Sequence, residues 1–444
     1  SRPTSPRLDS WVRDHRSVTF RQVVPPSGWT LPSHFSLFTG LEAFRHPANY
    51  YRMAVDASAY GFLAELLREA GYRTQAFTAG GFVHPIYGLA KGFDSFAYLA
   101  STELRLQELE MSLARVGSWL DDSREEPFLL FLHTYEIHTP NPARQPYFDQ
   151  FSDLPADWTV DVANDPTLPD GGFLAEFHPV IRRRPEEAAG LVPAALSDLP
   201  RDAYDSAIAF TDEKLAPLLQ RLTEPPFDRN TVVVLFSDHG ESFGELGRWG
   251  HANLTLSNLR VPLVVVLPGQ GKALTVPSQI RLIDLFPTLL ELAGVAVPQG
   301  IDGESLGPLL AGAQEPAGRA AFAYSASTNH GLSLLSPGGL QLDWRNSVWK
   351  PIASELVWFR TREFDEEPLA AAPTTADASE MARAMESTFG RRAAGLRLEV
   401  ENLSDLPLQL GIHSDLVDPA SVKSARLAGP RLEWKYIGFA AVNL

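Results

Sequence analysis

Short apolar segments without polar interruptions recur along the chain up to about residue 300. Residues 128–132, Thr231–Phe236 and 260–267 have this character, and none of them alternates apolar with polar positions. Strands of this kind are buried on both faces, as in sheets that are covered by helices on each side. The pattern predicts an α/β fold with a large, mostly parallel mixed sheet between helices.

Between these segments the chain has the spacing of helices. Residues 57–70 and 284–293 each carry an apolar stripe and end at a glycine, Gly71 and Gly294, which are typical helix stops. Residues 204–222 have apolar positions at helical intervals. Arg73–Thr78 is expected to be a strand that follows the first of these helices.

The regular alternation is interrupted twice. Residues 140–200 are rich in Pro, Asp and Arg, and we interpret them as a lid or insertion within an α/β domain that spans residues 1–312. Residues 313–444 have a different texture, with strand-like alternation at 396–400 and 406–412. This C-terminal region is predicted to hold a small antiparallel sheet. The alternative is that a β-sandwich begins near residue 395.

Composition narrows the choice of partners. The 444-residue chain has a formal net charge of −16, which repels phosphate backbones, so nucleic acid is not expected as a partner. A small anionic substrate would need screening, for which a bound metal ion is a common means. The chain has no cysteine, which excludes disulfides, thiolate ligands and a cysteine nucleophile.

The apolar runs are too short for a membrane-spanning helix, which needs about 20 residues. No signal peptide is visible, and the chain begins at Ser1, as a processed or truncated product would. The compartment and the oligomeric state stay open at this level.

Ligands of open α/β sheets bind beyond the carboxyl ends of the strands, so the residues that follow each apolar run matter most. Asp238, His239 and Gly240 follow Thr231–Phe236. A carboxylate and an imidazole at one strand end suit Zn, Mn, Mg or Ca. The ordinary alternative is an aspartate that caps the next helix, with a histidine beside it by chance.

A second polar group follows residues 128–132. His133, Glu136 and His138 lie within six positions and precede Pro140, which restricts the loop. A single histidine there would usually be a structural hydrogen-bonding residue. Two histidines and a glutamate make a ligand-binding role as reasonable as a structural one.

Thr30 precedes Pro32, a residue favoured in the first turn of a helix. Thr30 is therefore expected at the positive end of a helix, where an alkoxide would be stabilised and a tetrahedral anion would dock. The ordinary alternative is that it only caps the helix. His251, after Gly250, could be a ligand, a donor to the substrate or a surface histidine.

Taken in order, these segments resemble the sulfatase family of the alkaline-phosphatase superfamily. The resemblance extends over residues 1–312 and begins with Thr-Leu-Pro-Ser-His-Phe-Ser-Leu-Phe-Thr-Gly at residues 30–40, which is similar to the family's nucleophile signature. Further similar motifs lie at residues 66–74, 91–94, 131–138, 237–241, 259–263, 283–289 and 302–306. A whole series in sequence order is far more specific than any one motif.

The resemblance implies an alkaline-phosphatase-like fold with one or two divalent ions at the carboxyl edge of the sheet. Thr30 falls at the nucleophile position and would also bind the metal, together with Asp238 and His239. His138 falls on the histidine that contacts the substrate or leaving group, and His251 falls near the family's cationic substrate-binding position. Both are expected to be catalytic, and either one would protonate the leaving oxygen. His34 and His133 are expected to bind substrate. The resemblance does not identify the ion as Ca, Mg, Mn or Zn.

Three features depart from the family pattern. Thr30 cannot become formylglycine, the oxidised Cys or Ser of true sulfatases, because its β-carbon bears a methyl group. His34 stands where the family has an arginine, so the usual stabiliser of the nucleophile is expected to be weaker or pH-dependent, since histidine titrates near neutrality. The family's first strand, which carries metal-binding aspartates, is expected to precede Ser1, so the chain is predicted to lack that strand.

The residues and the resemblance together favour a metal-dependent hydrolase of small anionic esters of the sulfate or phosphate type. One alternative is a transferase, in which an alcohol intercepts the Thr30 intermediate. Another alternative is a degenerate, non-enzymatic member of the family that only binds an anion. Two features favour this alternative: histidine at position 34 and the missing strand. The resemblance is compatible with an exported or periplasmic protein.

Overall fold

The structure is a computed structural model of the 444-residue chain. It describes residues 2–48, 54–99, 107–122, 126–138, 144–152, 160–162, 179–181, 193–243, 249–314, 318–325, 329–347, 355–361, 366–368, 396–401, 409–414 and 438–443.

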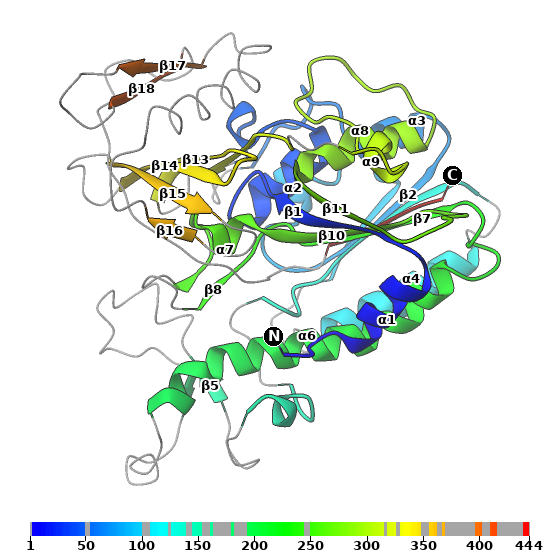
Figure 1. Cartoon of the computed structure of the whole chain (residues 1–444). Helices are drawn as coiled ribbons and strands as arrows, with labels where there is room; N and C mark the ends of the chain where they lie inside the picture. Colours follow the sequence, from blue (N-terminus) through cyan, green and yellow to red (C-terminus); the bar gives the residue numbers. More distant parts are fainter. Residues whose placement is uncertain are drawn as a thin grey trace.

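A large sheet of eight strands forms the centre of the fold (Figure 1). In spatial order the strands are β11 (Leu274–Arg281), β1 (Val18–Val24), β10 (Val261–Val266), β7 (Thr231–Phe236), β19 (Gly438–Asn443), β4 (Phe128–His133), β2 (Arg73–Thr78) and β3 (Ser95–Tyr98). The pairings make β10 and β19 antiparallel to their neighbours, while all the others run in one direction. The predicted mixed, mostly parallel α/β sheet is confirmed.

Helices cover both faces of this sheet (Figure 1). One face carries α1 (Pro6–Asp14), α4 (Glu108–Asp122) and α6 (Pro193–Leu222), and the other carries α2 (Thr30–Thr39), α3 (Leu63–Glu69), α8 (Leu285–Leu292) and α9 (Gly307–Leu310). The side chains of β4 alternate between the two cores: Leu129 and Phe131 pack in one, and Leu130 and Leu132 in the other. Burial on both faces explains why the strand sequences show no polar alternation.

Two element boundaries differ from the sequence prediction. The helix expected at 57–70 begins only at Leu63, because the Glu65 side chain accepts a hydrogen bond from the Phe62 amide, at 3.4 Å, and fixes the start there. The helix expected at 204–222 begins earlier, at Pro193, and contains Pro200 and Pro217. The direction of β10 could not be read from its apolar sequence, since burial on both faces looks the same in either direction.

The position of β19 was not expected. This strand comes from the C-terminal end of the chain and lies between β4 and β7, antiparallel to both. Gly438 pairs with His133 and with Phe236, so β19 begins at the carboxyl ends of its two neighbours. Its sequence, GFAAVN, contains no carboxylate. The large sheet therefore takes strands from both sides of residue 312.

The remaining sheets are antiparallel and smaller. One has five strands: β12 (Ala321–Ser325), β13 (Asn329–Leu335), β14 (Leu340–Ser347), β15 (Glu355–Thr361) and β16 (Glu366–Pro368). The paired strands are β17 (Leu396–Glu401) with β18 (Gln409–Ser414), β5 (Val160–Val162) with β6 (Pro179–Ile181), and β8 (Ser242–Phe243) with β9 (Trp249–Gly250). Short helical turns are η1 (Ala43–Arg45), η2 (Pro85–Tyr87), η4 (Phe148–Gln150), α7 (Leu256–Leu259) and η7 (Leu282–Asp284).

Most of the predicted lid or insertion at 140–200 lies outside the described residues, as does most of the segment from residue 395 where a β-sandwich was considered. Among the helices that are described, none combines the length and apolar character required to cross a membrane.

Candidate active site

The carboxyl ends of the parallel strands bring most of the predicted site residues to one edge of the sheet. The segment after β1 leads to Thr30 at the start of α2, β7 leads to Asp238 and His239, and β4 ends at His133. His251 follows the short strand β9. These segments are distant in the sequence and meet because the strands end at the same edge.

Thr30 is the first residue of α2, and Trp29 occupies the N-cap position. The alternative in which Thr30 serves as the N-cap is therefore wrong. Its side chain makes a different contact: Oγ1 lies 3.3 Å from Nε2 of His239. Thr30 is 1% exposed, so its hydroxyl lies in a water-poor environment at the positive end of a helix.

The hydrogen bonds of His239 define which ring nitrogen faces Thr30. Nδ1 lies 2.8 Å from the carbonyl oxygen of Gly240, and a carbonyl can only accept, so Nδ1 carries the proton. In a neutral imidazole Nε2 then has a lone pair. That nitrogen can accept a hydrogen bond from the Thr30 hydroxyl or bind a metal ion.

Asp238 is fully buried beside this pair. Its Oδ2 lies 3.4 Å from Nδ1 of His34 and 3.7 Å from Nε2 of His239. Nδ1 of His34 also donates to the backbone carbonyl of Thr30, at 2.9 Å. A carboxylate oxygen, an imidazole nitrogen and a threonine hydroxyl thus meet within a small buried volume.

His34, which contacts Asp238, and His133 are both fully buried. Their ring centroids are 4.9 Å apart, and their planes are nearly perpendicular. Each is held through Nδ1, His34 by Thr30 and His133 by the carbonyl of Ala79 at 3.1 Å. Burial lowers the pKa of His34 to about 4 and that of His133 well below its usual value. The expectation that His34 titrates near neutrality is wrong, because the sequence does not reveal its burial. Its substrate-binding role and that of His133 stay predictions.

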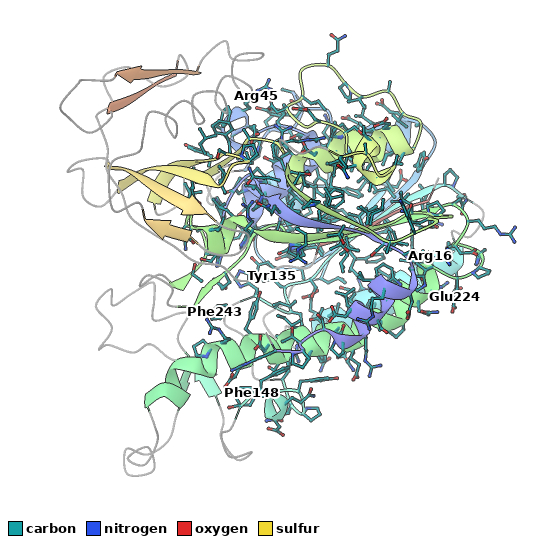
Figure 2. All side chains as sticks on the ribbon, viewed as in Figure 1. Arg16, Arg45, Tyr135, Phe148, Glu224 and Phe243 are labelled. Atoms are coloured by element: carbon teal, nitrogen blue, oxygen red, sulfur yellow. The ribbon has the colours of Figure 1, made fainter. Side chains whose placement is uncertain are left out.

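A row of rings leads outward from the buried pair. His239 stacks on His251 at 5.0 Å, His251 meets His138 edge-on at 5.1 Å, and His138 stacks on Tyr135 at 4.0 Å. His239 is fully buried, whereas His251, His138 and Tyr135 are partly exposed. Figure 2 shows Tyr135 on the side of the sheet that faces α6. The structure thus brings His138 and His251 together with Thr30 and His239.

The loop that carries His251 is fixed by backbone contacts. The Ala252 amide donates to the carbonyl of Gly28 at 2.7 Å, and a β-carbon on Gly28 would lie 2.0 Å from the carbonyl oxygen of Asn253. Gly250 and Ala252 both have positive φ angles, 73° and 64°. This conformation presses the His251 loop against the segment that leads into Thr30.

Glu241 and Gly28 contribute to the site, although the sequence assigned neither of them a role. Glu241 lies 3.4 Å from Nδ1 of His251, with a side chain that is 2% exposed. His251 itself is neutral at pH 7, because burial lowers its pKa to about 4. Gly28, the second residue, could have been suspected, because a glycine just before Trp29 and Thr30 permits close backbone approach.

The described residues do not form a complete metal cage. No group of three or more His, Cys, Asp or Glu side chains in the described part of the chain is arranged to hold an ion. Asp238 and His239, with Thr30, supply three donors of different types. Catalytic zinc ions commonly have three protein ligands and an open position for water or substrate, so this donor set fits an open site of that kind.

Comparison with known proteins places this geometry in context. The sequence model of the Sulfatase family matches residues 1–295. Arylsulfatase K of Homo sapiens is 24% identical over 322 residues, which are 66% of this chain and 60% of that protein. Choline-sulfatase of Rhizobium meliloti (strain 1021) is 27% identical over 233 residues, 50% of this chain and 41% of that protein. The chain thus spans only part of the length of these relatives.

Solved structures show the same fold. The phosphonate monoester hydrolase of Silicibacter pomeroyi has a TM-score of 0.67 at 18% identity, and the match covers 89% of this chain and 92% of that chain. A protein bound to its substrate D-glucosamine-2-N,6-O-disulfate has a TM-score of 0.64, also at 18% identity, with coverage of 87% and 92%. Since the family's sequence model covers about two thirds of the chain, the protein belongs to the sulfatase family, with the alkaline-phosphatase-like fold of these structures.

Proposed function

We propose that this protein hydrolyses small anionic esters of the sulfate, phosphate or phosphonate type, with Thr30 as the nucleophile. The observation that carries the proposal is the position of the Thr30 hydroxyl, 3.3 Å from Nε2 of His239 at the N-terminus of α2. The relatives named as arylsulfatase, choline-sulfatase and phosphonate monoester hydrolase support the class of ester. Thr30 favours phosphate-type esters as much as sulfate esters, because threonine cannot form the aldehyde used by true sulfatases.

The sulfatase family generally uses a divalent metal ion, and we propose Asp238, His239 and Thr30 as its protein ligands here. A buried carboxylate, an imidazole and a hydroxyl suit Zn, Mn, Mg or Ca. The net charge of −16 does not disfavour any of these cations. Such an ion would lower the pKa of the Thr30 hydroxyl and neutralise the oxygens of the ester.

The chain's own residues then account for the chemistry. The ionised Oγ1 of Thr30, stabilised by the amides of the first turn of α2, attacks the sulfur or phosphorus atom, and the bond from that atom to the leaving oxygen breaks. In-line displacement puts the leaving oxygen on the side opposite the nucleophile. His138 is the outermost histidine of the ring row, and it is therefore the residue proposed to protonate that oxygen.

Water completes the cycle by attacking the Thr30 ester, which breaks the bond between Oγ1 and the transferred group and releases sulfate, phosphate or phosphonate. His138, having lost its proton to the leaving oxygen, can take a proton from this water. His251 lies between His138 and His239 and is proposed to donate a hydrogen bond to a non-bridging oxygen of the ester.

The test compares Thr30→Ala with Thr30→Ser, using 4-nitrophenyl sulfate, 4-nitrophenyl phosphate and 4-nitrophenyl phenylphosphonate as substrates. We expect Thr30→Ala to lose turnover of the preferred ester by at least about a thousandfold, because the nucleophile is removed. Thr30→Ser should keep measurable turnover and accumulate a covalent adduct that mass spectrometry detects. Folding is checked by thermal unfolding of each variant. Undiminished hydrolysis by a folded Thr30→Ala variant would refute the proposal.

A further inference from the structure

The N-terminus of α4 touches the loop that carries His138. The loop follows β4 and runs from Thr134 to His138, and α4 begins at Glu108. Since α4 leads into β4, its N-terminus lies at the same edge of the sheet as the carboxyl end of β4. Glu108 is 4% exposed, which is unusual for a glutamate in the first turn of a helix.

One carboxylate oxygen of Glu108 holds the loop at two atoms. Oε2 accepts a hydrogen bond from the backbone amide of Tyr135 at 3.1 Å and a longer one from the Thr134 hydroxyl at 3.5 Å. The Thr134 hydroxyl in turn accepts from the amide of Glu136 at 3.1 Å. The first three residues of the loop are thus tied to a single buried side chain.

From Tyr135 the constraint continues to His138 by two contacts. The amide of His138 donates to the carbonyl of Tyr135 at 3.0 Å, and the two rings stack at 4.0 Å with an interplanar angle of 15°. The Tyr135 ring also packs close to Gly80, where an added β-carbon would lie only 2.0 Å from the ring. The Tyr135 ring thus contacts both Gly80 and His138, so a shift of the Tyr135 backbone would move the His138 ring.

A second anchor holds the same loop from α6. The Glu136 carboxylate pairs with Arg144, whose guanidinium lies 4.4 Å from the centroid of Phe210 on α6. The amide of Arg144 donates to Ser206, also on α6, at 3.0 Å. With this anchor in place, removal of Glu108 should loosen the turn at Tyr135 without releasing the whole loop.

We propose that Glu108 is a positioning residue that fixes His138, through the Thr134–Tyr135 turn, for protonation of the leaving oxygen. The inference rests on the proposed function, since it takes His138 as the proton donor. Glu108 itself touches neither the nucleophile nor the reacting atoms. Its distance from His138 in the sequence and its place in a helix explain why no motif marks it.

The test uses esters that differ in their need for protonation. A 4-nitrophenyl ester has a good leaving group and needs little help, whereas the phenyl ester of the same acid depends on the proton donor. We expect Glu108→Ala to lower kcat for the phenyl ester at least tenfold and for the 4-nitrophenyl ester less than threefold, with KM changed less than threefold. A purely structural role would lower both rates by the same factor.

Three further variants make the result decisive. Glu108→Gln retains an oxygen that can accept both hydrogen bonds, and it should restore the phenyl ester rate to within threefold of the wild type. Glu110→Ala is the matched control, because Glu110 lies in the same helical turn but pairs with Lys214 at 3.3 Å, and both rates should be unchanged. If Glu108→Ala fails to fold, Thr134→Val removes the hydroxyl of the same turn and should show the same selective loss.

Equal losses on both esters, or no rescue by Glu108→Gln, would overturn the inference. Failure of the proposed function would be seen separately, as hydrolysis retained by Thr30→Ala in the same assay. An enzyme that depends on Thr30 but loses both esters equally on removal of Glu108 contradicts only the role of Glu108.

Discussion

Oγ1 of Thr30 and Nε2 of His239 lie 3.3 Å apart, although 209 positions separate the two residues in the sequence. Nδ1 of His239 donates a hydrogen bond to the carbonyl of Gly240, which leaves the lone pair on Nε2, the nitrogen that faces the threonine. Asp238 adds a buried carboxylate 3.7 Å from the same nitrogen. Because these three side chains are the proposed metal ligands, a substitution at one of them should change the metal content of the protein.

We predict that Asp238→Asn loses bound divalent metal. The substitution keeps the shape of the side chain but removes the negative charge, and a buried ion depends on charged ligands. Metal analysis of purified wild-type protein should give a stoichiometric ion that a chelator removes with loss of activity and a lower Tm. The Asn variant should contain less than a tenth of that metal. The control is Asp228→Asn. Asp228 lies before the first residue of β7, at the end of the strand away from Asp238, so this variant should retain the ion.

A second prediction concerns the backbone contact between Gly28 and Asn253. The new methyl of Gly28→Ala would lie 2.0 Å from the Asn253 carbonyl oxygen and must push the His251 loop away from Thr30. A displacement of about 1 Å at a catalytic group can lower rate about a hundredfold, and we expect a loss in kcat of ten- to a hundredfold. Gly81→Ala adds a methyl with no atom within 4 Å and should leave kcat unchanged. Equal activity of the two variants would show that the contact does not position His251.

The composition of the site was largely predictable because α/β sheets concentrate ligands at one edge. Thr30, His138, Asp238 and His239 were picked out as residues following a strand or opening a helix, and His251 because it follows Gly250. The structure brings their segments together. The physical reason is general: parallel strands expose their carboxyl ends on one side. The catalytic and metal-binding roles of these residues stay predictions until they are measured.

Other features depend on contacts that no local pattern records. The low pKa of His34 results from its complete burial. This burial is created by the tertiary fold and cannot be recognised in the sequence. The place of β19 results from a pairing between a strand at residues 438–443 and two strands that lie about 200 and 300 positions earlier in the sequence. Glu108 lies in an ordinary amphipathic helix, and only its hydrogen bond to Tyr135 connects it to the site.

The last prediction concerns a buried carboxyl far from the proposed chemistry. Glu42 is 2% exposed, and burial raises its pKa to about 8, although Arg281 lies 3.9 Å away and acts in the opposite direction. In the unfolded chain the pKa is near 4.5. Between these values the folded protein holds a proton that the unfolded chain releases, so the contribution of Glu42 to stability falls as pH rises from about 4.5 to about 8.

Glu42→Gln should therefore stabilise the protein in a pH-dependent way. At pH 5 the protonated carboxyl and the amide are both neutral and similar in shape, so the two Tm values should nearly agree. At pH 8.5 the variant should be more stable, by a few kcal/mol and at most about 5 kcal/mol, since each pKa unit corresponds to about 1.4 kcal/mol. Glu304→Gln is the matched control, because Glu304 pairs with the same Arg281 at 3.2 Å but is 56% exposed, and such pairs contribute about 0–1 kcal/mol. Thermal unfolding from pH 5 to 8.5 checks the prediction, and a Glu42→Gln curve parallel to that of the wild type would contradict it.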